Sequence, residues 1–310
     1  FLDERQGTAI QFRPTPIFYP GKPGSWDDHY VETPALVRKA GTYYLFYSAF
    51  PKAKAKRYQI GAATFEVDSG ESLEDALLPG ERTFERFSNE PILGPSRTGS
   101  HFDRDNTQEP SILFRNGRFE LYYLGIRATK TNSPEEIGND PLTDGSQFEE
   151  IGFGRILLDE NLHRVPAEYD HRAFLSSQFR KTGITGDLVN IPQVIFRDGR
   201  YHLFYAPLDG TGPSHKDSSI AYRGSRDGIA WSQPKRLLRK GDGQEDNWGI
   251  MAPCPSVNGE RWELVFTAWG HWPELMPTDC FKGRFRTPIG SGADYQGCLS
   301  MSLGFAEQVK

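Results

Sequence analysis

Residues 190–205 read Asn190-Ile-Pro-Gln-Val-Ile-Phe-Arg-Asp-Gly-Arg-Tyr-His-Leu-Phe-Tyr205. A Pro opens a short apolar run, an Asp-Gly pair interrupts it, and a second run rich in aromatic residues follows. Asp-Gly between two such runs is a strong signal for a β-hairpin, because both residues accept the positive φ angles of a tight turn. The stretch therefore predicts two antiparallel strands joined by a two-residue turn.

The same pattern occurs three more times, in residues 32–47, 108–123 and 251–266. The turn Gly follows the Pro by seven residues in the first three copies and by six in the fourth. Each hairpin is followed by a run that can form a third strand, at residues 60–65, 151–156, 220–223 and 299–303. Weaker fourth strands are expected at residues 83–87 and 233–237. Four antiparallel strands per repeat are typical of a β-propeller blade.

The repeats predict an all-β chain that forms one β-propeller domain over residues 1–310, built of four-stranded antiparallel blades. No linker or low-complexity tract separates the four visible copies. Residues 11–18 resemble residues 84–93, the segment before the second copy. We expect this N-terminal strand to complete the final blade, which closes the ring and removes its open edge.

Composition and charge exclude several classes of function. The net charge is -5, from 36 basic and 41 acidic residues, and the only short basic run is residues 52–57, so we expect no nucleic-acid partner and no anionic membrane surface. No apolar run approaches ~18 residues, so no transmembrane helix is expected. The three cysteines form no Cys-x-x-Cys pair; Cys280 and Cys298 can be bridged, which leaves Cys254 free. We expect a secreted or periplasmic location rather than a cytoplasmic one, and the sequence predicts no oligomeric state.

The residues just before each repeat Pro are the candidates for a binding site. The innermost strand of each blade lines the central channel, so these residues crowd around its concave mouth. They are Asp27, Asp28, His29, Glu32 and Thr33; Asp103, Arg104, Asp105, Asn106, Gln108 and Glu109; Asp187 and Asn190; and Asp246, Asn247 and Trp248. Paired carboxyl groups suit the cleavage of a glycosidic bond, and tryptophan rings stack on sugar faces.

Several motifs together resemble the five-bladed β-propeller glycoside hydrolases, which include glycoside hydrolase families 43, 32, 68, 117 and 130. They are Tyr43-Tyr-Leu-Phe-Tyr47, Glu109-Pro-Ser-Ile112, Ser225-Arg-Asp-Gly-Ile-Ala-Trp231 and Trp262-Glu-Leu-Val-Phe-Thr-Ala-Trp269. The resemblance covers roughly residues 17–305. It implies five blades, with the fifth expected within residues 269–297; a four-bladed ring is the alternative.

The resemblance also implies roles for particular residues, and the sequence departs from the family pattern at two of them. Glu109 stands where the family has a carboxylate that orients the acid and tunes its pKa, and Glu32 stands near the first-blade base. Thr33 holds a position where an Asp is expected, and Asn190, which cannot donate a proton as an acid, holds that of the third-blade Glu. Asp187, Asp105 or a His, as in family 117, can then supply the acid.

We therefore predict a glycoside hydrolase that acts on an oligo- or polysaccharide at the channel mouth. Glu32 is the expected base or nucleophile, Glu109 the acid or pKa tuner, and Asp187 and Asp105 the reserve acids. The expected substrate-binding residues are Asp28, His29, Arg104, Gln108, Asn190, Trp248, Trp269 and His271. One alternative is a non-catalytic carbohydrate-binding propeller. Another is a phosphorylase or transferase, with Arg104, Arg38 or Arg57 as anion ligands.

No cofactor is expected to be required, and no residue is assigned as a catalytic metal ligand. Two oxygen-rich stretches, residues 103–106 and 241–246, have the ligand type that a structural Ca²⁺ needs. Neither stretch has the Glu at position twelve of an EF-hand loop.

Overall fold

The computed structural model describes residues 2–3, 8–9, 16–52, 57–128, 148–180, 183–186, 188–207, 219–239, 249–258, 261–272 and 298–307. Over these residues the protein is all-β apart from the short helix α1 (Leu73–Leu77). Within the described ranges, no helix has the length and apolar character that crossing a membrane requires.

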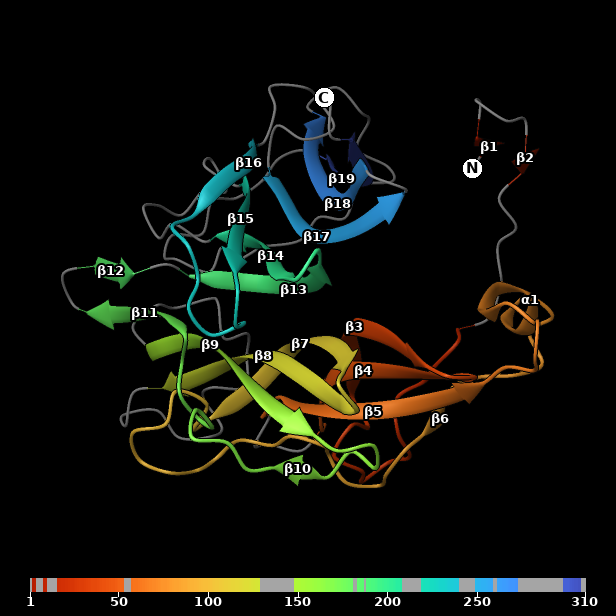
Figure 1. Ribbon diagram of the computed structural model, residues 1–310, viewed down its shortest axis with the longest axis horizontal. Coiled ribbons are helices and arrows are strands. Elements are labelled where there is room, and N and C mark those ends of the chain that lie inside the picture. Colours follow the sequence, from red (N-terminus) through yellow and green to blue (C-terminus); the bar gives the residue numbers. More distant parts are fainter. Residues whose placement is uncertain are drawn as a thin grey trace.

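Four antiparallel sheets follow one another along the sequence (Figure 1). The first contains β3 (Tyr30–Lys39), β4 (Thr42–Phe50), β5 (Gln59–Glu66) and β6 (Glu85–Arg86), in that order. The third contains β13 (Val189–Arg197), β14 (Arg200–Pro207), β15 (Ser219–Ser225) and β16 (Lys235–Arg239). Both match the four-stranded blade that the repeats predict.

The second and fourth sheets depart from four strands. The second has six: β7 (Asn106–Arg115), β8 (Arg118–Ala128), β9 (Phe148–Leu158), β10 (Arg164–Val165), β11 (Leu175–Arg180) and β12 (Gly183–Gly186). Its order is β12-β11-β9-β8-β7, and β10 pairs with the far end of β9. The fourth has three: β17 (Gly249–Asn258), β18 (Arg261–Trp272) and β19 (Cys298–Glu307). Long β9 hydrogen-bonds a different partner at each end, which is why the second sheet grows beyond a blade.

The closure of a ring by the N-terminal strand stays a prediction. Residues 10–15 lie outside the described residues, and β1 (Leu2–Asp3) pairs with β2 (Thr8–Ala9) in a sheet of their own. The Phe84 amide donates a hydrogen bond to the Ile17 carbonyl at 2.9 Å, so residue 17 lies beside the first sheet. A fifth blade is likewise not confirmed, because most of the segment expected to form it, residues 273–297, lies outside the described residues.

Two of the four predicted hairpin turns are confirmed in their backbone conformation. The turns after β7 and β13 have positive φ at both central residues: 50° and 71° at Asn116-Gly117, and 50° and 72° at Asp198-Gly199. That is the type I′ pattern, whose twist matches the twist of the strands it joins.

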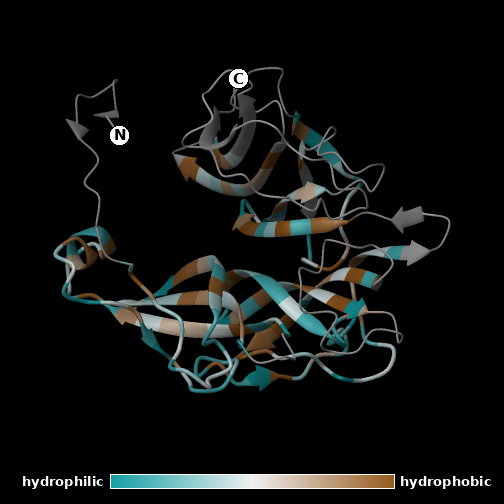
Figure 2. Ribbon diagram, turned by 180° about the vertical axis from the view of Figure 1, so that it is seen from behind, coloured by the Kyte–Doolittle hydropathy of each residue, from teal (hydrophilic) through white to brown (hydrophobic). Residues whose placement is uncertain are grey.

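Hydrophobic side chains fill the seams, by which we mean the spaces between consecutive sheets. Aromatic rings from both sheets meet in each seam: Tyr44 with Phe119 at 4.9 Å between centroids, Tyr122 with Tyr201 at 6.3 Å, and Phe204 with Trp262 at 5.4 Å. In Figure 2 the hydrophobic segments run along the strands, while hydrophilic segments gather in many of the connecting loops. The aromatic second strand of each repeat therefore joins one blade to the next.

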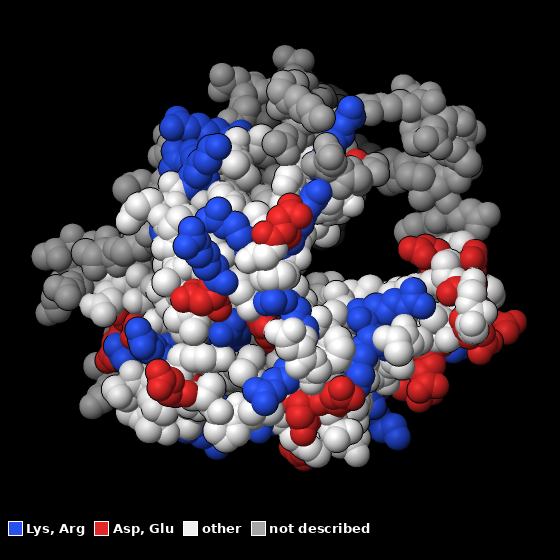
Figure 3. Space-filling view, viewed as in Figure 1, with Lys and Arg blue, Asp and Glu red and all other residues white. Residues whose placement is uncertain are grey.

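Charged side chains of both signs are interspersed on the face shown in Figure 3. Some of the charged residues pair between sheets. Lys39, at the end of β3, forms a 2.8 Å ion pair with Glu160, which follows β9 of the second sheet. Such pairs at the surface add little to stability, so the aromatic seams contribute most of the cohesion between blades.

Each innermost strand carries the same irregularity at the residue before its repeat Pro. The strand register shifts at this point in β3, β7, β13 and β17. The pre-proline residues have left-handed backbones, with φ of 49° at Thr33, 55° at Glu109, 48° at Ile191 and 51° at Ala252. β-Branched residues such as Thr and Ile rarely adopt this conformation, and such strain often marks functional sites. We call these four positions the pre-proline bulges.

Phe102 shows how the loop before β7 is anchored to the second sheet. Its side chain is 2% exposed and lies over Gly125 of β8 and Gly152 of β9, which face each other across the strand pair. A Cβ atom built at Gly125 stands 2.5 Å from the Phe102 ring, so only glycine leaves room for it.

We predict that Gly125→Ala lowers the free energy of unfolding by about 1–3 kcal/mol, because the methyl group displaces the Phe102 ring. Gly99→Ala is the matched control, since its Cβ has no atom within 4 Å. Urea denaturation of both variants measures the difference. Equal stability of Gly125→Ala and the control would contradict the packing described here.

Candidate functional site

The pre-proline bulges of the first three sheets are joined by hydrogen bonds. The inner strand β7 lies against β3 on one side and against β13 on the other. The Glu109 amide of β7 donates to the Ser48 hydroxyl of β4 at 2.8 Å. The Ile191 amide of β13 donates to the Glu109 carboxylate Oε2 at 2.6 Å. Glu109 therefore connects three sheets through its own backbone and side chain.

Glu109 is the carboxyl group with the most unusual surroundings at this site. It is 7% exposed, and its Oε1 accepts a 3.3 Å hydrogen bond from Gln108 Nε2. Burial raises its pKa from 4.5 to about 7, and the nearby negative charge of Glu32 also raises it, while the hydrogen bonds from Ile191 and Gln108 oppose the shift. At neutral pH a substantial fraction of Glu109 therefore carries a proton, as a general acid requires.

Glu32 stands one residue before the Thr33 bulge and is exposed to solvent. It pairs with Ser48 across β3 and β4, and Ser48 in turn contacts Glu109. The Thr33 hydroxyl donates to Ser48 Oγ at 2.6 Å. The structure thus brings together two sequence-predicted carboxylates, one buried and one exposed, beside a buried serine.

Polar side chains around Glu109 are buried to an unusual degree for such residue types. Five lie on β7 and β13: Asn106, Thr107, Gln108, Ser111 and Asn190. Among the described residues, the Gln108 side-chain oxygen is buried without a hydrogen-bond partner. An unpaired buried acceptor beside a carboxyl group is a position where a ligand hydroxyl can bind.

Ser48 and Ser111 are site residues that the sequence analysis missed. Ser111 accepts the Val194 amide across the next seam at 2.8 Å, as Ser48 accepts that of Glu109. The available signal was a lone small hydroxyl at the end of a buried aromatic run, Tyr47-Ser48. Buried hydroxyls need partners, so such a residue points to an irregular backbone nearby.

Asp105 and Arg104 lie near Glu109 in sequence but are bound to each other. Arg104 Nε contacts Asp105 Oδ2 at 2.8 Å, and the Ala128 amide donates to the same oxygen at 2.9 Å. Arg57 lies 3.9 Å from the other oxygen, Oδ1. Asp105 thus contacts two guanidinium groups and holds the start of β7 to the end of β8. Arg38, another candidate anion ligand, donates a hydrogen bond from its Nε to the Ala40 carbonyl at the hairpin turn after β3.

Asp28 and His29 lie at the same end of the first sheet as Glu32, but the side chains of both contact other groups of the protein. Asp28 accepts amide hydrogen bonds from Lys52 and Gly24, both at 2.7 Å, and these hold its pKa below its ordinary value. His29 packs edge-on against the Tyr30 and Phe50 rings. Asp27 is fully buried and pairs with Arg86 at 2.7 Å.

Four further predicted residues cannot be placed by their side chains. Asp187 and Trp248 lie outside the described residues. Trp269 and His271 belong to β18, but their side chains are not described.

The fold is shared with solved structures of carbohydrate-active proteins. The structure of BT0996 in complex with RGII matches with a TM-score of 0.57 at 11% identity, over 92% of this protein and 72% of that one. The endo-arabinase of Bacteroides thetaiotaomicron matches with a TM-score of 0.50 at 14% identity, over 83% and 75%. The sucrose-6-phosphate hydrolase of Lactobacillus gasseri matches with a TM-score of 0.50 at 16% identity, over 77% of this protein.

The sequence spans 40% of the length of the sucrose-6-phosphate hydrolase. No family model and no curated protein matches it. The expected resemblance to glycoside hydrolases of propeller fold is confirmed at the level of the fold, and the family within that group is open.

We predict that Glu109 makes the stability of the protein depend on pH. Below pH 4.5 it is protonated in both the folded and the unfolded state; between pH 4.5 and about 7 only the unfolded state ionises, so stability is lost as the pH rises. The loss is about 3 kcal/mol at 1.36 kcal/mol per pKa unit. Urea denaturation from pH 4 to pH 8 should show this loss in the wild type and a weaker dependence in Glu109→Gln. Parallel profiles would contradict the raised pKa.

Proposed function

We propose that this protein is a glycoside hydrolase whose active site lies at the pre-proline bulges of β3 and β7. One observation carries the proposal: a buried carboxyl group with a raised pKa, Glu109, lies beside the exposed carboxylate of Glu32. Two carboxyl groups in contrasting environments are what acid–base cleavage of a glycosidic bond needs. The fold shared with glycoside hydrolases supports the same interpretation.

In the proposed reaction, Glu109 protonates the leaving glycosidic oxygen and Glu32 acts as the base or the nucleophile. Ile191 and Gln108 both donate hydrogen bonds to the carboxyl oxygens of Glu109. When Glu109 has lost its proton, these same two donors stabilise the anion. Glu32 adds a nearby negative charge, which favours the positive charge that develops on the sugar ring.

Gln108 is the proposed substrate-binding residue closest to the acid. Its side-chain oxygen, buried and without a partner among the described residues, can accept a hydrogen bond from a sugar hydroxyl. This interaction would also keep its amide group directed at Glu109. Asn190, 3% exposed on β13, is a second amide near the bulge of Ile191.

Glu109 is favoured over the reserve acids for a geometric reason. Asp105 is held by Arg104 and by the Ala128 amide, so the acid role would require it to leave both. Asp187 lies outside the described residues, and its role as a reserve acid remains a proposal. An oligo- or polysaccharide substrate, a five-bladed closed ring and a secreted or periplasmic location also remain proposals; the neighbouring carbohydrate-active proteins support the first.

The first step of the test is to find a substrate. A panel of oligosaccharides and of nitrophenyl furanosides and pyranosides should yield at least one that is cleaved. Binding without any product in long incubations would instead favour a carbohydrate-binding propeller. Turnover only with inorganic phosphate would favour a phosphorylase.

We predict that Glu32→Gln and Glu109→Gln each lower kcat on an oligosaccharide by about 100-fold or more, the scale of a lost acid or base. On a nitrophenyl glycoside the two variants should separate, because a nitrophenolate leaves without protonation. Glu109→Gln should then retain much more of its activity than Glu32→Gln. Steady-state kinetics on both substrates measure the difference.

Glu90→Gln, an exposed carboxylate outside the bulges, is the matched control and should keep wild-type kinetics. Near-normal kcat for both site variants on the oligosaccharide would rule out the proposed pair. An equal loss for Glu109→Gln on both substrates would rule out its role as the acid.

A further inference from the structure

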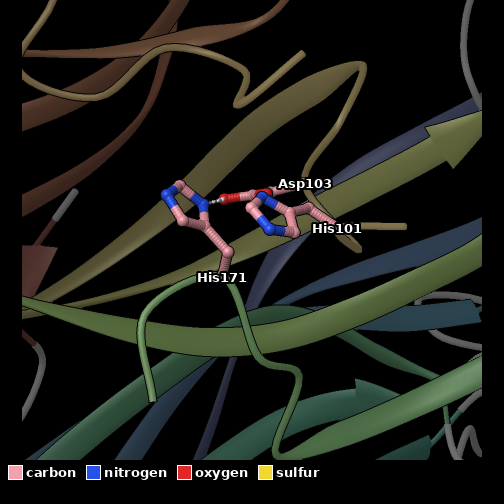
Figure 4. A group of neighbouring side chains, drawn as sticks. All are labelled: His101, Asp103 and His171. Carbon is pink, nitrogen blue, oxygen red and sulfur yellow. Dashed lines mark hydrogen bonds and ion pairs between the residues drawn. The ribbon is translucent and has the colours of Figure 1, made fainter. Parts of the chain in front are cut away.

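A cluster of metal-ligating side chains lies away from the pre-proline bulges. His101 and Asp103 belong to the loop that leads into β7, and His171 belongs to the loop that follows β10 (Figure 4). One ligand atom from each of the three residues lies within 4.8 Å of the others. Two segments about 70 residues apart in sequence therefore meet through groups that bind metals.

Asp103 is the centre of this cluster. Its side chain is fully buried, and its Oδ2 accepts hydrogen bonds from Tyr123 at 2.8 Å and from His171 Nδ1 at 2.7 Å. Its other oxygen, Oδ1, is buried and has no hydrogen bond of normal geometry among the described residues, and the Ser96 side chain lies beside the same carboxylate. A buried carboxylate oxygen that lacks a partner is costly, and a bound cation removes that cost.

His101 adds a second buried atom of this kind. Its Nδ1 is buried and also has no hydrogen-bond partner in the described part of the sequence. Its ring is stacked on that of His171, with centroids 4.6 Å apart and an angle of 10° between the planes. Two unpaired ligand atoms, one oxygen and one nitrogen, thus lie beside a second imidazole.

We infer that His101, Asp103 and His171 bind a divalent transition-metal ion, most readily Zn²⁺. Two imidazoles and one carboxylate are a frequent zinc ligand set, which leaves a fourth position for water. The nitrogen ligands distinguish this site from the all-oxygen Ca²⁺ site expected from residues 103–106. Asp105 of that stretch pairs with Arg104 instead, so its oxygens do not join Asp103.

Four local changes would accompany binding. Zinc ligands at about 2.0–2.2 Å from the ion stand about 3.4 Å apart, so the cluster contracts, and one stacked ring turns until both nitrogens point at one centre. At His171 the ring proton moves from Nδ1 to Nε2, and Arg164 gives up its 2.8 Å contact with that nitrogen. Arg164 keeps its ion pair with Asp170, at 3.2 Å.

The ion would join two loops of the second sheet, one of which leads into β7, the strand that carries Glu109. Phe102, between the two ligands of the first loop, is already packed on Gly125 and Gly152. Asp103 precedes Glu109 by six residues in the same segment. The metal would therefore fix the path of the backbone into β7.

The test uses the full-length protein, treated with EDTA, dialysed and titrated with zinc chloride in a calorimeter. We expect one equivalent to bind, and His101→Ala to weaken binding by at least about 100-fold, since even outer-shell changes cost up to that much. Cobalt(II) should give the visible absorption of a tetrahedral site in the wild type and lose it in the variant. Zinc should also raise the Tm of the wild type but not of the variant.

His163→Ala is the matched control, because His163 is an exposed histidine near the same strand β10 that contacts only Asp159 in the described residues. It should bind zinc like the wild type. If His101→Ala does not fold, as judged by circular dichroism, His101→Gln and Asp103→Asn replace it. Absence of zinc binding, or binding unchanged in the folded ligand variants, overturns the inference.

Discussion

The left-handed backbone at the residue before each repeat Pro is the constraint on which the site depends. At each bulge the strand register shifts, which frees backbone amides from the sheet ladder. Freed amides inside a protein need new acceptors, and here they find them in the adjacent sheet. The Glu109 amide binds Ser48, and the Ile191 amide binds the Glu109 carboxylate. The strain of the bulge is thus coupled to the joining of three sheets.

Burial and proton affinity at Glu109 have the same origin. The seams are filled by aromatic rings contributed by the second strand of each hairpin, and this packing excludes water from the inner strands. A carboxyl group placed there is desolvated, which raises its pKa. Glu32, one strand away and before its own bulge, stays in water. Small differences in the same repeated motif therefore place the two carboxyl groups in different environments.

The sequence predicted what depends on local pattern: the four hairpins and the conformation of two of their turns. It also singled out Glu32 and Glu109 among the residues before the repeat prolines. It predicted less of the features that depend on pairing between strands far apart in the sequence. Nothing in residues 159–186 indicates that β9 pairs with β10, β11 and β8 at once, because strand partners depend on tertiary contacts. His101 and His171 form no motif with regular spacing, so only the fold brings them together. Arg57 likewise comes to 3.9 Å from the Asp105 carboxylate only through the fold, because the two residues are distant in the sequence.

The 2.6 Å contact between the Ile191 amide and Glu109 makes the seam between the second and third sheets a chemically responsive joint. Sliding one sheet against the other would lengthen this contact and weaken the stabilisation of the carboxylate anion. By thermodynamic reciprocity, a change in the charge of Glu109 must alter the strength of the contact between the two sheets. The mechanical stiffness of this seam should therefore change whenever the group loses or regains its proton.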